Sequence, residues 1–118
     1  MIFRKWSARI RTEQVDEYIR YIESTGAAHY AETDGNLGYQ ILSRDLGDGT
    51  SEIATASWWT TFDAIRRFAG DDYDRAHYYA DDDRYLLDRP DFVEHYEIRR
   101  SSGGQNEASL FTEEMPRE

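Results

Sequence analysis

The sequence has 118 residues, of which 39% are hydrophobic, and it contains nine Tyr, five Phe, three Trp and no Cys. This length suits one domain with a modest core, and the lack of cysteine excludes disulfides, thiolate nucleophiles, iron–sulfur clusters and thiolate-bound zinc. The formal net charge of −10 disfavours binding to nucleic acid or to an anionic membrane.

The first two predicted elements are a strand and a helix. The strand, Ile2 to Ile10, alternates: Ile2, Trp6, Ala8 and Ile10 share one face, and Lys5, Ser7 and Arg9 share the other. Thr12 is the expected N-cap of the following helix. Its apolar stripe is Val15, Tyr18, Ile19 and Ile22, which predicts a helix to about Thr25. Gly26 ends or bends this helix, since residues 27–31 could form a further helical turn.

Turn signals at residues 34–36 and 47–49 separate the elements that follow. The expected elements are a strand from Leu37 to Ser43, a strand from Glu52 to Trp59, a helix capped by Thr60 or Thr61 and stopped by Gly70, and a strand from Phe92 to Arg99. Residues 71–90 have poor periodicity, with a helical turn at 74–80 followed by loop. Residues 100–118 are a polar tail that we expect to be flexible, or docked on a partner through Leu110 and Phe111.

This order predicts an α+β domain over residues 1–99 with a ferredoxin-like β-α-β-β-α-β fold. Its four-stranded antiparallel sheet should carry both helices on one face. The other face should be polar, yet neither side of residues 53–59 carries a charge. A strand without a charged face is usually covered on both sides. The simplest cover is the same sheet of a second copy, which predicts a homodimer.

The arrangement of aromatic residues around these elements resembles a known family. Trp6 lies in the first strand, a hairpin runs from Gly38 to Ser57, and the stretches Trp59 to Ile65, Phe68 to Gly70 and Val93 to Ile98 follow. Over residues 2–99 this order is similar to the antibiotic biosynthesis monooxygenase family of dimeric α/β barrels. The resemblance implies a dimer whose two sheets close into a barrel, with a pocket between sheet and helices in each subunit. It also implies an oxygenase-like activity, because relatives include cofactor-free oxygenases of aromatic polyketides, quinol oxygenases and haem-degrading monooxygenases.

Two of the three histidines are candidates for catalysis. His77 follows the second predicted helix, near the position that the family resemblance implies for a functional histidine, and an imidazole there could accept a phenolic proton. His95, in the last strand, is the second candidate. The plainer alternatives are a loop histidine paired with an aspartate for His77 and a hydrogen-bonded structural residue for His95.

Aromatic side chains are the better guide to a ligand, because aromatic-lined pockets suit flat apolar molecules. The expected pocket-lining residues are Trp6, Tyr30, Tyr39, Trp59, Phe68 and Tyr96. The resemblance implies that haem binding needs a tryptophan on the second helix and an asparagine on the first strand. Phe68 and Ser7 stand there instead, so we expect no cofactor, with haem as the disfavoured alternative. The acidic run from Asp71 to Asp83 lacks metal-ligand spacing, and no metal is expected.

The leading hypothesis is therefore a small oxygenase that acts on an aromatic or quinol-type molecule without a cofactor. The alternative is a non-catalytic, ligand-binding or stress-associated dimeric barrel. No stretch approaches the ~20 apolar residues of a membrane span, and residues 1–10 lack the apolar run of a signal peptide. We thus expect a cytoplasmic homodimer with no nucleic-acid or membrane partner.

Overall fold

A computed structural model describes residues 1–102. Its elements are β1 (Ile2–Arg11), η1 (Thr12–Gln14), α1 (Val15–Ser24), α2 (Gly26–Glu32), β2 (Asn36–Asp45), β3 (Thr50–Trp59), α3 (Phe62–Ala69), η2 (Asp82–Arg84) and β4 (Glu94–Glu97). The strands form one sheet in the order β2-β3-β1-β4, with every neighbouring pair antiparallel. This topology confirms the predicted ferredoxin-like fold. No helix among these residues has the length and apolar character to cross a membrane.

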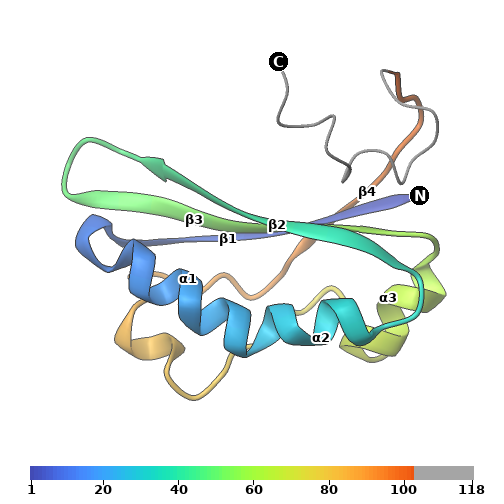
Figure 1. Ribbon diagram of the computed structural model, residues 1–118, viewed down its shortest axis with the longest axis horizontal. Coiled ribbons are helices and arrows are strands. Elements are labelled where there is room, and N and C mark those ends of the chain that lie inside the picture. Colours follow the sequence, from blue (N-terminus) through green and yellow to red (C-terminus); the bar gives the residue numbers. More distant parts are fainter. Residues whose placement is uncertain (103–118) are drawn as a thin grey trace.

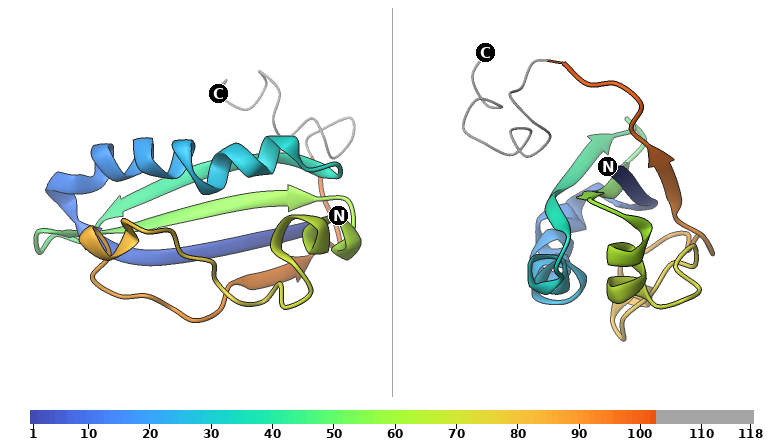
Figure 2. Two further views of the ribbon diagram at one scale, coloured as in Figure 1. Left: turned by 90° about the horizontal axis from the view of Figure 1, so that it is seen from below. Right: turned by 90° about the vertical axis from the view of Figure 1, so that its right-hand side faces the viewer.

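All three α-helices lie on the same face of the sheet (Figures 1 and 2). α1 and α2 run along one side of that face, and α3 lies beside them near the N-terminal end of β1. The segment 70–93 covers the side of β1, where the Leu87 amide donates to the Arg9 carbonyl at 2.8 Å and Leu86 pairs with Ile10. Helices and this segment together enclose the space beneath the centre of the sheet.

The core lies between the sheet and this cover. Ile10, Ile53, Trp59 and Ile65 each have 0% exposed surface, and they come from β1, β3 and α3. Their burial follows from the alternation in the sequence, because every second residue of β1 and β3 points toward the helices. Burial of such side chains is the main force that holds helix and sheet together.

The first helix differs from its predicted start and end. Thr12 is not its N-cap, because residues 12–14 form a 3₁₀ turn and the Thr12 hydroxyl bonds to Ser51 Oγ at 2.8 Å. The chain bends at Thr25 (φ −119°, ψ −100°), which divides the helix into α1 and α2. Thr61 does cap α3, since its hydroxyl accepts from the Ala64 amide at 3.1 Å.

The last third of the chain also departs from the prediction. No helical turn forms at 74–80, and the only helix-like piece between α3 and β4 is η2. β4 is shorter than the predicted strand because residues 92 and 93 pair with the loop instead of β1: Phe92 bridges to Arg75, and the Val93 amide donates to the Asp74 carbonyl at 2.7 Å. Most of the predicted tail, with Leu110 and Phe111, lies outside the described residues, so its role and the boundary at residue 99 stay predictions.

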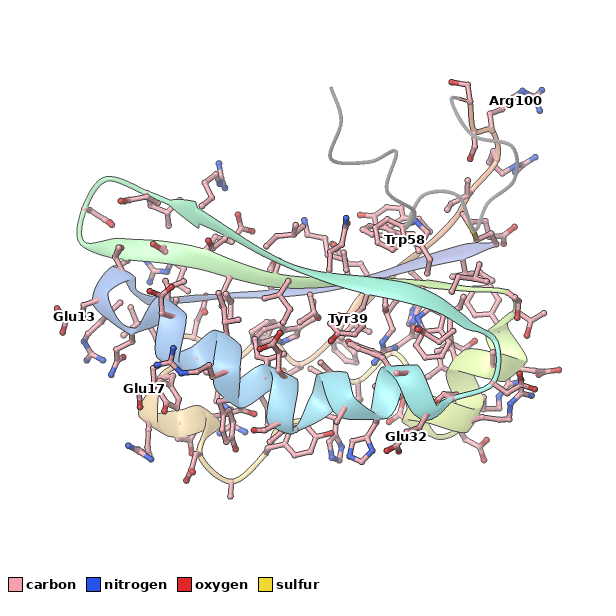
Figure 3. The ribbon with its side chains drawn as sticks, viewed as in Figure 1. Glu13, Glu17, Glu32, Tyr39, Trp58 and Arg100 are labelled. Carbon is pink, nitrogen blue, oxygen red and sulfur yellow. The ribbon has the colours of Figure 1, made fainter. Side chains whose placement is uncertain are left out.

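The outer face of the sheet carries aromatic rings. The Phe3 ring lies 5.0 Å from Trp58 and 5.9 Å from Tyr96, measured between ring centres. Trp58 lies on this outer side, whereas Tyr39 points toward the helices (Figure 3). Leu42 extends the apolar area with 46% of its surface exposed. Such a face is typical of a surface that a partner covers, and the dimer remains a prediction.

Candidate ligand-binding cavity

A cavity of about 90 Å³ lies beneath β1, between α1–α2, α3 and the segment 70–93. Its walls combine a few polar groups with many apolar and aromatic ones, an arrangement common in small-molecule sites. The lining residues are Arg4, Trp6, Tyr18, Ile22, Thr25, Gly26, Ala27, Tyr30, Thr55, Phe68, His77, Tyr78, Tyr79, Asp82 and Val93. Three of the predicted pocket aromatics, Trp6, Tyr30 and Phe68, are among them.

Arg4 is the cation of the cavity. It stands on the helix-facing side of β1, between Ile2 and Trp6, and only 6% of it is exposed. Its Nη1 donates to the Tyr73 carbonyl at 2.7 Å and to His95 Nε2 at 2.8 Å, and its guanidinium carbon lies 5.6 Å from the centre of the Phe68 ring. Burial lowers the pKa of Arg4 below its ordinary value of 12.5, while Tyr30 and Asp74 act in the opposite direction. An arginine side chain stays charged even so.

The partners of Arg4 do not neutralise it. Within residues 1–102 it forms no ion pair, since its two hydrogen bonds go to a carbonyl and an imidazole. Because a guanidinium can only donate, His95 Nε2 must accept, and the imidazole proton must sit on Nδ1. Nδ1 lies 3.0 Å from Asp74 Oδ1 and donates to it. Burial, and then the charge of Arg4, lower the pKa of His95 below 6.5, against the effect of Asp74.

Aromatic rings form most of the remaining wall. Tyr30 stacks on Phe68 with ring centres 4.7 Å apart. On the other side, Trp6 Nε1 donates to the Tyr78 hydroxyl at 3.1 Å, and that hydroxyl donates to the Pro90 carbonyl at 2.6 Å. These bonds fix the rings of Trp6 and Tyr78 edge to face, with centres 6.2 Å apart. Ring faces and ring edges thus line the cavity.

Asp82 is the anion of the cavity and is only 4% exposed. Its Oδ1 accepts from the Tyr18 hydroxyl at 2.8 Å, and its Oδ2 accepts from the Tyr79 amide at 2.6 Å. Burial, followed by the charge of Asp82, raises the pKa of Tyr18 far above its ordinary value, so this hydroxyl keeps its proton. Asp82 forms no ion pair with any side chain of the described part of the chain.

The other predicted site residues lie elsewhere. His77 lines the mouth of the cavity and is exposed; its ring centre lies 5.1 Å from that of Tyr79. Tyr39 packs behind Tyr30, at 5.3 Å between ring centres. Trp59 is fully buried in the core, where its Nε1 donates to Ser57 Oγ at 2.8 Å. Tyr96 is on the outer face of the sheet because its side chain alternates with that of His95 along β4.

Sequence reasoning missed the two charged residues of the cavity. Arg4 stands at an even position of the first strand, which places it on the apolar face with Ile2 and Trp6. A single arginine on an otherwise apolar face was therefore an available signal. The sequence contains no such signal for Asp82. This residue lies in the run Asp81-Asp82-Asp83, and only its tertiary contacts distinguish it from its neighbours.

No protein-family profile matches the sequence, and no curated protein matches it. Solved structures do share its architecture. A Bacillus cereus protein named as an antibiotic biosynthesis monooxygenase superposes with a TM-score of 0.55 at 15% identity, over 87% of this chain and 96% of that one. The chain shares the fold of that protein. A variant of MhuD, solved with two manganese protoporphyrin IX groups per active site, has a TM-score of 0.51 at 14% identity, over 88% of this chain and all of that one.

The cavity does not fit a metalloporphyrin of the kind bound by MhuD. Its volume of about 90 Å³ is well below the several hundred ångström cubed of a typical cofactor pocket. The buried Asp82 carboxylate would also oppose the negative side chains of such a group. Among residues 1–102 no three His, Cys, Asp or Glu side chains cluster as metal ligands would.

Proposed function

We propose that this protein binds a small aromatic molecule with an acidic hydroxyl, of the phenol or quinol type, and oxidises it with dioxygen. The observation that carries the proposal is the buried, unneutralised guanidinium of Arg4 in a cavity lined by aromatic rings. Flat rings suit the walls of this cavity. A phenolate oxygen suits Arg4, because charge-assisted hydrogen bonds in a poorly solvated site are strong.

The reaction follows from what a phenolate can do. Once ionised, a phenol with a hydrogen on its para carbon is electron-rich enough to reduce dioxygen. One oxygen atom becomes a new carbonyl at that carbon, and the other leaves as water with the two hydrogens that the ring and the hydroxyl lose. The product is a quinone. The protein's part is to stabilise the anion, orient it and keep out bulk water.

His77 is the proposed base. It lies at the mouth of the cavity, and within residues 1–102 neither of its ring nitrogens is engaged in a hydrogen bond, so it can accept a proton and pass it to solvent. His95, the second candidate, is a positioning residue in this scheme, because its Nε2 holds Arg4 and its Nδ1 is committed to Asp74.

The test compares His77→Ala with His29→Ala, using 1-naphthol as the probe. His29 is a matched control because it is exposed on α2 and is not part of the cavity. Oxygen uptake and quinone absorbance should both fall about 10²-fold in the His77 variant, as expected when a positioned base is lost, and stay unchanged in the His29 variant. Equal rates in the two variants would remove His77 from the mechanism.

One observation favours a second candidate function. The cavity is small and its walls are largely the protein's own aromatic side chains, which suits a binding protein that performs no chemistry. In that case 1-naphthol should bind, with perturbed signals from the cavity residues, while the wild-type protein takes up no oxygen above the rate without protein.

A further inference from the structure

The cavity holds two buried charges of opposite sign at different ends. Arg4 lies against Phe68 of α3 and against His95 of β4. Asp82 belongs to η2 and lies against Tyr18 of α1. Figures 1 and 2 place α3 and α1 toward opposite ends of the sheet. Trp6 and Tyr78 line the same cavity and add aromatic ring surfaces to it.

We infer that Asp82 binds a hydrogen-bond donor on the ligand, so that the ligand is a two-ended quinol: one hydroxyl faces Arg4 and a second donates to Asp82. This inference rests on the proposed function and narrows its substrate class from phenols in general to aromatic diols and their amino analogues. A 1,4-diol has no hydrogen on its para carbon, so it gives two electrons and its two hydroxyl protons to dioxygen, and the products are the quinone (the quinone imine for an amino analogue) and hydrogen peroxide.

Asp82 has the capacity for this contact. A carboxylate offers about four acceptor positions, and Asp82 uses two of them, for the Tyr18 hydroxyl and the Tyr79 amide. It is 4% exposed, and no cation among residues 1–102 pairs with it. Because a buried carboxylate without a counter-charge is costly, a further donor from the ligand stabilises it. An ether, a halogen or a second carboxylate at that end has no proton to give and is rejected.

A purely structural role for Asp82 makes a different prediction. Its side-chain carboxylate accepts a hydrogen bond from the Tyr79 amide, and its backbone carbonyl accepts from the Tyr85 and Leu86 amides at 3.0 Å. These bonds stabilise the loop around η2. If that were its whole role, ligands with and without a second hydroxyl would bind alike. The difference between two such ligands in the unaltered protein therefore separates the two roles without any change to the fold.

The experiment compares benzene-1,4-diol with 4-fluorophenol by anaerobic NMR titration. Fluorine is close to hydroxyl in size but has no proton, and it is the more apolar substituent. We expect the diol to bind about 10-fold to 100-fold more tightly, as for a hydrogen bond to a buried charge. In Asp82→Asn, whose amide oxygen still accepts a hydrogen bond but carries no charge, this preference should fall about 3-fold to 10-fold. Tyr18→Phe, which removes a competing donor and keeps the carboxylate, should retain it.

Each outcome decides between the proposals. Equal binding of both ligands, with both weakened in Arg4→Lys, overturns the role of Asp82 and leaves the proposed phenol site intact. A preference for the diol of unchanged size in Asp82→Asn also overturns it, because the charge of Asp82 then takes no part in recognising the donor. If the asparagine variant does not fold, the comparison in wild type and Tyr18→Phe still decides. Absence of binding by either phenol to the wild type overturns both proposals.

Discussion

The side chains of Arg4, His95 and Asp74 form a continuous chain of hydrogen bonds. The guanidinium donates to the imidazole, and the imidazole donates to the carboxylate. Neutral His95 thus lies between the cation Arg4 and the anion Asp74. The side chain of Asp74 is 65% exposed, so solvent contacts the chain of hydrogen bonds at this residue. This arrangement holds Arg4 in place and leaves its charge available to the cavity.

Through His95, the stability of the fold should depend on pH. His95 has a folded-state pKa below the ordinary 6.5, so below about pH 6.5 the unfolded chain takes up a proton that the folded chain does not. The contribution of His95 to the free energy of unfolding is therefore complete above the pKa that His95 has in the unfolded chain. This contribution decreases as the pH falls toward the pKa of His95 in the folded protein. His95→Gln, which can still accept from Arg4, should lose less stability on acidification than wild type.

Urea unfolding at about pH 7.5 and about pH 5.5 measures this difference. His29→Gln is the control, because it makes the same substitution at an exposed position of α2 outside the cavity. An identical acid-induced loss in His95→Gln and wild type would show that other groups carry the dependence.

At the scale of elements, the turn before β2 locks the sheet to α3. Gly35 has φ +95°, and its carbonyl accepts from the Thr60 amide at 2.9 Å. A Cβ at this position would lie 2.5 Å from Ala64 Cβ and 2.9 Å from Thr60 Oγ1. Both the backbone conformation and the lack of space therefore require glycine.

Gly35→Ala should lower the free energy of unfolding by about 2–4 kcal/mol, through backbone strain and overpacking together. Gly49→Ala isolates the first of these effects, because Gly49 has φ +87° and no atom within 4 Å of its would-be Cβ. Its loss should be about 1–2 kcal/mol. Thermal unfolding of the two variants gives both values, and equal losses would mean that the packing of the turn against α3 contributes nothing.

Most of the strands and helices could be predicted from the sequence. β1 and β3 follow the period of two, α1 and α3 follow the helical period, and Thr61 and Gly70 end α3 where expected. Segment 70–93 could not be predicted, because it has no period of its own. Its shape comes from pairings with distant residues, such as the Leu87 amide with the Arg9 carbonyl. Asp82 could not be identified for the same reason, because it belongs to this segment, whereas the alternation of β1 already places Arg4 on the helix-facing side of the sheet.

At the scale of the whole molecule, the outer face of the sheet carries the prediction of a dimer. Besides the rings of Phe3, Trp58 and Tyr96, it has a hollow of about 220 Å³ lined by Lys5, Leu42, Ser43, Arg44, Glu52 and Ala54. Exposed aromatic and apolar side chains gathered on one face are typical of an interface. The same face of a second copy would bury well over ~1,000 Å² in total, enough for a stable contact.

Leu42→Glu tests this prediction, because Leu42 is 46% exposed and a glutamate there should not disturb the monomer. Ala28→Glu, an equal charge change at an exposed position of α2, is the control. By light scattering at micromolar concentration, wild type and the Ala28 variant should be dimers and the Leu42 variant a 13.9 kDa monomer. A monomeric wild type would contradict the prediction.

The net charge of −10 surrounds a cavity whose own recognition group is a cation. For a ligand of the proposed kind, the negative charge of the protein surface acts during the approach, and the positive charge of Arg4 acts after entry. Outside, the protein repels a molecule that is already ionised; inside, Arg4 attracts the same molecule. The fast route is then entry as the neutral phenol and release of the proton after arrival. For such a phenol, the acidic exterior would select ligands by protonation state before the cavity selects them by shape.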